Sequence, residues 1–132
     1  MSQENVEIIR RAYEAGSRGD WDAGLRDLHP DGELTFEAGP QAGTHRGREE
    51  IVAVLSDLTA GFDAWIQEPL EFVESDDHVV VVVRNRLRPR GGASGEFEYR
   101  NGFIWTIRDG TILSVVGYPN PEAALEAAGL RD

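Results

Sequence analysis

Arg84 is the residue whose setting points most directly to chemistry. Within the stretch HVVVVVRNRLRP, strand alternation places Arg84 on the same face as Val80 and Val82. A guanidinium on an apolar face is costly unless an anion or an acceptor pairs with it. Two pairings remain open. Arg84 binds a ligand carboxylate, phenolate or carbonyl, or it forms an internal ion pair with Glu96 or Glu98.

Three further side chains could act as an acid, a base or a hydrogen-bond donor. Glu37 would serve as a general base if the strand end bulges inward, because burial raises the pKa of a carboxyl group. Alternation with Phe36 instead directs Glu37 to solvent, which is the orientation we expect. Tyr13 can donate to a ligand oxygen, although its helical spacing also fits core packing. His45, just before a helix, is either an acid or base or an exposed loop histidine.

Motifs for metal and cofactor chemistry are missing from the sequence. There is no cysteine, and His29, His45 and His78 occur singly without HxH or HxxxH spacing, so we expect no metal site. GxSxG, P-loop and GxGxxG motifs are also missing. We therefore expect no cofactor.

The composition limits the partners and the compartment. The 24 acidic and 13 basic residues give a formal net charge of -11, which repels phosphate backbones and anionic membranes. We therefore expect neither nucleic acid nor membrane as a partner. The 132 residues contain no repeat or linker-like stretch, which favours a single domain over 1–132. Neither a signal peptide nor a membrane-spanning run is apparent, so a cytoplasmic protein is expected; the redox compartment stays open.

The apolar periodicity predicts the elements that must position these side chains. Helical spacing predicts three helices in the N-terminal half and a short tail helix capped by Asn120. Pro69 indicates a bulge or an edge position in one strand, and a long hairpin turns at GGASG, residues 91–95. Together these features predict an α+β fold with a mostly antiparallel sheet. The expected helices cover 6–13, 21–28 and 51–62, and the expected strands cover 34–36, 65–73, both arms of the 78–108 hairpin and 111–118.

Four stretches carry a family resemblance: IIRRAYEAGSRGDWDAGLRDLHPDGEL, THRGREEI, SGEFEYRNGFIWTIRDGTI and PNPEAALEAAGL. Through them the chain resembles the SnoaL-like and ketosteroid isomerase-like branch of the nuclear transport factor two-like superfamily. The resemblance implies a cone-shaped α+β barrel, with three N-terminal-half helices on a curved sheet and a short C-terminal helix. This fold hosts isomerases, cyclases, epoxide hydrolases, dehydratases and non-catalytic domains, so it does not name a reaction.

The resemblance also implies a hydrophobic pocket on the concave face of the sheet. Arg84 and Tyr13 would face this pocket, and His45 would lie beside its mouth. The convex face, which would carry Val79 and Val81, is expected to be covered by a second copy in a homodimer. The expected ligand contacts are Trp21, Phe36, Trp65, Val82, Asn101, Phe103 and Trp105.

The ketosteroid isomerase mechanism itself is not matched. It needs a carboxylate base, a tyrosine and a protonated carboxylic acid. The corresponding positions fall on residues 36–38, on Ala12, and on Tyr99 or Phe103, and only a one-residue shift supplies Glu37. The hypothesis is therefore a protein that binds a small hydrophobic metabolite, with cofactor-free acid/base chemistry of the isomerase, cyclase or dehydratase type. The alternatives are a non-catalytic carrier or sensor, and a protein-interaction module.

Overall fold

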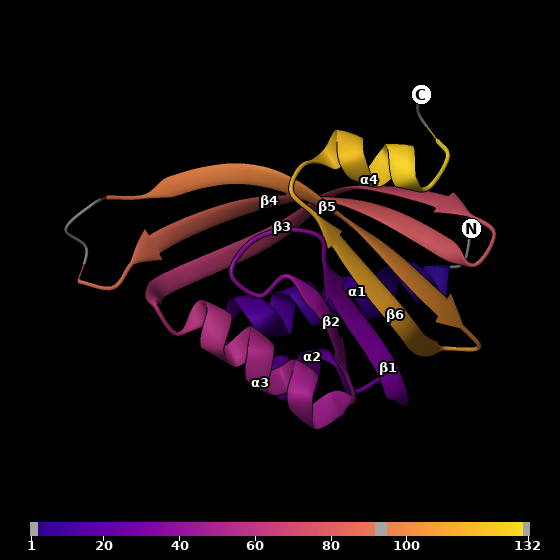
Figure 1. The fold of residues 1–132 in the computed structure, drawn as a ribbon, viewed down its shortest axis with the longest axis horizontal. Helices are drawn as coiled ribbons and strands as arrows, with labels where there is room; N and C mark the ends of the chain where they lie inside the picture. Colours follow the sequence, from indigo (N-terminus) through magenta and orange to yellow (C-terminus); the bar gives the residue numbers. More distant parts are fainter. Residues whose placement is uncertain (1–2, 92–94, 131–132) are drawn as a thin grey trace.

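One curved sheet separates three helices from a fourth. The computed structural model describes residues 3–91 and 95–130. In Figure 1, α1 (Gln3–Ser17), α2 (Trp21–Gly24) and α3 (Arg48–Thr59) lie on the concave side of the sheet, and α4 (Pro121–Ala127) lies on the other side. The predicted α+β fold class is confirmed. None of these helices has the length and apolar character needed to cross a bilayer.

The sheet has six strands and is open, with β2 and β3 as its edges. Its order is β2-β1-β6-β5-β4-β3; β1 pairs with β6 in parallel, and the other neighbours pair antiparallel. The strands are β1 (Leu28–Phe36), β2 (Gly43–Arg46), β3 (Phe62–Ser75), β4 (His78–Pro89), β5 (Phe97–Arg108) and β6 (Thr111–Tyr118).

Several local signals have the predicted effect. Asp109 and Gly110 have φ values of 53° and 75°, as a two-residue hairpin turn between β5 and β6 requires. Asn120 caps α4 by accepting a hydrogen bond from the Ala123 N–H at 2.8 Å. Pro69 lies in the edge strand β3 beside a register shift. Residues 92–94 of the GGASG turn lie outside the described residues.

Two predicted boundaries differ from the structure. The second helix ends at Gly24 rather than near Leu28, because Leu28 begins β1 and the Ile112 N–H of β6 bonds the Asp27 carbonyl at 2.8 Å. The HPDG segment, residues 29–32, therefore lies within β1. Residues 43–46 lie outside the expected strands but form β2 on the outer edge of β1.

The predicted strand phase of β4 is wrong. Val79, Val81 and Val83 belong to the core beneath α1–α3, and the alternate residues, including Val82 and Arg84, face the other side of the sheet. On that other side, Val80 packs against Ala124 and Leu125 of α4. The phase was ambiguous because both faces of the valine run are apolar. On the outer face, α4 covers the part of the sheet around Val80.

The C-terminal end of α1 is attached to the free edge of β3. The Gln67 backbone N–H donates to Ser17 Oγ at 2.9 Å. This contact satisfies a backbone donor of an edge strand, which would otherwise be open to pairing with another chain. It also fixes the helix that carries Tyr13 against the sheet.

Candidate functional site

A cavity of about 640 Å³ lies between the helices and the concave face of the sheet. Its lining is mainly aromatic and aliphatic, with a few polar groups, as is usual for a small-molecule site. Tyr13 lines it from α1, Ile51 and Leu55 from α3, and Val115 from β6, while the loop over 38–41 and Pro119 complete the wall.

All three tryptophans of the chain line this cavity. Trp21 comes from α2, Trp65 from β3 and Trp105 from β5, so three elements that are distant in the sequence each contribute an indole. The ring of Trp21 lies directly over Gly16 of α1, where an added Cβ would be only 2.3 Å from the indole. Gly16 therefore permits the close contact between α1 and α2 that forms this part of the wall.

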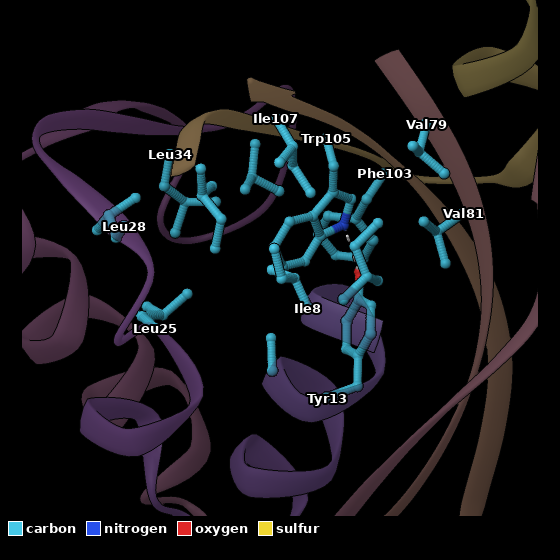
Figure 2. Packing of buried hydrophobic residues seen from close by; sticks show 14 of the residues in the cluster. Ile8, Tyr13, Leu25, Leu28, Leu34, Val79, Val81, Phe103, Trp105 and Ile107 are labelled. Atoms are coloured by element: carbon cyan, nitrogen blue, oxygen red, sulfur yellow. Dashed lines mark hydrogen bonds between the residues drawn. The ribbon is translucent and has the colours of Figure 1, made fainter. Parts of the chain in front are cut away.

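A first hydrogen-bonded pair joins Trp105 to Tyr13. Trp105 Nε1 donates to Tyr13 Oη at 3.1 Å, and Figure 2 shows the phenol rising from α1 to meet the indole. Tyr13 is only 3% exposed, and burial raises its pKa above the ordinary value of a phenol, so the hydroxyl stays protonated. No described residue accepts the proton of this hydroxyl.

A second chain of hydrogen bonds runs from Trp65 through Asn85 to Asn101. Trp65 Nε1 donates to Asn85 Oδ1 at 3.0 Å, and Asn85 Nδ2 donates to Asn101 Oδ1 at 3.0 Å. Asn85 is 0% exposed, and no other polar or charged residue in 3–91 or 95–130 is classed as buried. Asn101 lines the cavity, and its Nδ2 donates to no described residue.

Two more polar atoms in the cavity wall are buried without a partner. They are Trp21 Nε1, a donor, and Gln67 Oε1, an acceptor, and neither bonds to any residue that the structure describes. Buried polar groups are nearly always hydrogen-bonded in folded proteins. A molecule the size of water can hardly reach either atom, so both lie within the packing of the wall and not on the surface of the cavity.

Of the residues proposed from sequence, Arg84 and Val82 lie outside the cavity. Arg84 faces the outer side of the sheet, where its Nε donates to Glu68 Oε1 at 3.1 Å. This hydrogen bond raises the pKa of Arg84 further above its usual range. The expected partners Glu96 and Glu98 were wrong, because the partner lies on β3 instead. Val82 is the neighbouring outward-facing residue of β4.

Glu37 and His45 also do not line the cavity. Glu37 is exposed, as alternation predicted. His45 lies on β2 with Nε2 2.9 Å from the Gln41 carbonyl oxygen and Nδ1 3.6 Å from the Glu50 carboxylate. Both ring nitrogens thus contact the protein, which gives His45 a role in joining the 38–41 loop to α3.

The remaining predicted contacts do border the cavity, and sequence reasoning missed others. Asn85 was missed although a signal for it exists. In β4 it points to the same side as Val83, and the alternate residues Arg84 and Arg86 indicate that the opposite side faces solvent. The acidic side chains in the lining are Glu33, which receives a hydrogen bond from Arg46 Nε at 3.0 Å, and the exposed Asp57. The predicted residues that line the cavity are Tyr13, Trp21, Phe36, Trp65, Asn101, Phe103 and Trp105.

Metal-ligating residues do not gather in this region. Across the described ranges, no three histidine, aspartate or glutamate side chains come together in an arrangement that could hold an ion.

The fold and the sequence have counterparts among known proteins. An uncharacterised protein of Mycobacterium tuberculosis is 30% identical over 125 residues, which cover 93% of this chain and 94% of that protein. The structure of TerC co-crystallised with polyporic acid has a TM-score of 0.74 at 24% identity, covering 87% of this chain and 90% of that chain. A putative SnoaL-like polyketide cyclase from Jannaschia has a TM-score of 0.76 at 20% identity, covering 89% and 88% of the two chains.

The two solved structures, at 24% and 20% identity, establish the shared fold alone. The SnoaL-like domain matches this sequence over residues 9–115. That segment includes most of α1, all of α2 and α3, the long hairpin and most of β6, and hence most of the cavity wall. The chain belongs to the SnoaL-like family.

Proposed function

We propose that this chain binds a small hydrophobic metabolite in the cavity on the concave face of the sheet. The observation that carries the proposal is an apolar cavity of about 640 Å³ whose wall contains all three tryptophans of the chain. A ligand with aromatic or aliphatic rings would fill the apolar volume, and its polar groups would lie near Asn101, which lines the cavity. Membership of the SnoaL-like family supports a ligand-binding role.

The second candidate is a cofactor-free isomerase or cyclase that uses the same cavity. The favouring observation is the Tyr13 hydroxyl, because a phenol that burial keeps protonated is a steady donor to a developing enolate oxygen. A putative polyketide cyclase shares the fold, which also supports this candidate. The chemistry also needs a base within reach of the substrate. Asp57, exposed at the C-terminal part of α3, is the acidic lining residue without an arginine partner among the described residues.

A matched pair of substitutions on β6 tests where the ligand binds. Val115 lines the cavity, whereas Val116 faces the other side of the sheet. Thermal-shift screening against aromatic ketones, phenols and carboxylic acids, with polyporic acid included, should give stabilising hits for the wild type. Those hits should disappear in Val115→Phe, which fills the cavity, and persist in Val116→Phe. Hits that survive in Val115→Phe would place binding elsewhere.

We also propose that the chain forms a homodimer through the outer face of the sheet beyond α4. Ile66 is 37% exposed there, and the outward residues of β3, β4 and β5 alternate in charge, with Glu68 opposite Arg84 and Arg86 opposite Glu98. A two-fold interface brings the same patch of each copy together, and a mixed-charge patch can be self-complementary. Light scattering at micromolar concentration should give the mass of a dimer, and a stable monomer would contradict this.

We expect the protein in the cytoplasmic fraction of its cell.

A further inference from the structure

The charged residues in the wall of the cavity are all acidic. They are Glu33 and Asp57, and across 3–91 and 95–130 no arginine, lysine or histidine belongs to the lining. The sequence has 13 arginine and lysine residues, so basic residues were available to the fold. Sites for carboxylates and phosphates are usually built with such residues, above all with arginine. The wall of this cavity is therefore not equipped to hold an anion.

The basic side chains that contact the wall are bound to acceptors and do not reach the cavity. Arg46 Nε donates to the Glu33 carboxylate at 3.0 Å, and Arg48 donates to two backbone carbonyl groups in and beside α2. His45 Nε2 lies 2.9 Å from the Gln41 carbonyl oxygen. None of these three side chains is part of the lining within the described structure. A ligand inside the cavity would meet the acceptors of the wall, not these cations.

Asp57 adds a negative charge to the wall without an arginine partner among the described residues. It is exposed in the last part of α3, and the lining continues through Leu58 and Thr59. The C-terminal end of a helix carries the negative end of its dipole, and the last turn of α3 has no basic residue to offset it. Burial and the nearby charge of Glu37 raise the pKa of Tyr118, which also lines the cavity. These groups all contribute a negative potential to the cavity.

The wall is also rich in aromatic rings that attract positive charge. All three tyrosines of the chain line the cavity together with its three tryptophans. The face of an aromatic ring is electron-rich and attracts cations, and indole does so most strongly. These residues come from α1, α2, β3, β5 and β6, so the attraction belongs to the wall as a whole and does not depend on one point where the rings meet.

We propose that the ligand of this cavity is a hydrophobic amine in its positively charged form, and that the cavity binds compounds of one skeleton in the order cation, neutral molecule, anion. The inference rests on the proposed ligand-binding function and names its ligand class. A carboxylate would lose its hydration and meet no positive group. An alkylammonium ion also loses hydration, but the aromatic rings and the charge of Asp57 offset that cost.

The net charge of the chain acts in the same direction. At -11 it raises the local concentration of cations and lowers that of anions around the protein. The proposed order is one of affinity, so neutral and acidic aromatic compounds still bind, with higher dissociation constants.

The test compares three naphthalene compounds that differ in charge. Isothermal titration calorimetry at pH 7 measures the dissociation constants of N,N-dimethyl-1-naphthylmethylamine, which is protonated, of neutral 1-naphthylmethanol and of anionic 1-naphthylacetate. The wild type should bind the amine about tenfold more tightly than the alcohol, and the alcohol about tenfold more tightly than the carboxylate.

Two charge reversals separate the local charge from the net charge. Asp57→Arg reverses the charge at the wall and should lower the preference for amine over carboxylate about tenfold. Glu126→Arg is the matched control, because it makes the same change in net charge at an exposed helical position on α4, across the sheet from the cavity. It should leave the preference within about twofold of the wild-type value. Circular dichroism shows whether each variant is folded.

The outcomes separate the charge inference from ligand binding itself. Equal wild-type affinities for the three compounds, or tightest binding of the carboxylate, would overturn the charge inference and leave binding in the cavity intact. A preference that falls equally in both variants would also overturn it, because the net charge alone would then account for the order. Failure of all three compounds to bind would overturn the inference, and failure of the aromatic ketones as well would overturn the proposed function.

Discussion

Removing the Asn85 side chain should destabilise the protein by about 3–5 kcal/mol. The substitution Asn85→Ala deletes two hydrogen bonds, each with a net contribution of about 1 kcal/mol, and leaves the Trp65 N–H without its acceptor, which costs about 1–3 kcal/mol more. Asn101 also loses a partner, but its amide can turn toward the cavity, so the free-energy cost at Asn101 is smaller than that at Trp65. In a chain of this length each kcal/mol lowers the melting temperature by roughly 3–5 °C.

Urea unfolding followed by circular dichroism measures this loss, and a double-mutant cycle with Trp65→Phe attributes it. Trp65→Phe removes the N–H, so the Asn85→Ala effect should be about 1 kcal/mol smaller in that background. Arg88→Ala, at an exposed position further along β4, is the control and should leave stability unchanged. A loss below about 0.5 kcal/mol for Asn85→Ala, or no coupling to Trp65, would refute the proposed chain of hydrogen bonds.

Three further predictions follow from the placement of individual side chains. Arg84→Ala should leave the ligand dissociation constant unchanged in calorimetry, because Arg84 pairs with Glu68 outside the cavity; weakened binding would contradict this. Leu125→Ala should cost about 2–3 kcal/mol in urea unfolding yet spare ligand binding, because Leu125 packs on Val80 across the sheet from the cavity. A near-neutral effect would mean that α4 does not cover that face. Burial raises the pKa of Tyr13, so its proton is held more tightly when folded and stability should fall as pH rises above about 10. Tyr13→Phe should flatten that decline, whereas an unchanged slope would show that Tyr13 ionises freely in the folded protein.

Most of the fold was predictable because its signals are local. Glycine, asparagine and proline mark turns and caps through their own backbone and side-chain geometry, as at Gly110, Asn120 and Pro69. The signal that determines which residues of β4 face the helices is not local. A run of five valines satisfies either orientation, and the choice depends on α1–α3 covering one face and α4 the other.

The site was predictable in its aromatic lining but not in its polar groups. Large aromatic residues at core spacing are expected to be buried, and Trp65, Phe103 and Trp105 do line the cavity. Arg84 attracted attention because a charge on an apolar face is unusual, yet the outer position next to Glu68 relieves that cost. Asn85 is informative only once its two partners on β3 and β5 are known, because a single asparagine in a strand carries no partner in its sequence.

Intrinsic tryptophan fluorescence during titration with 9-fluorenone and with polyporic acid is the most direct test of the central claim. All three tryptophans line the cavity, so a bound aromatic carbonyl compound must come close to at least one indole. The account predicts saturable one-to-one quenching that is lost in Val115→Phe and kept in Val116→Phe. Quenching that never saturates with either compound, or that is the same in both β6 variants, would contradict the claim that this cavity binds the ligand.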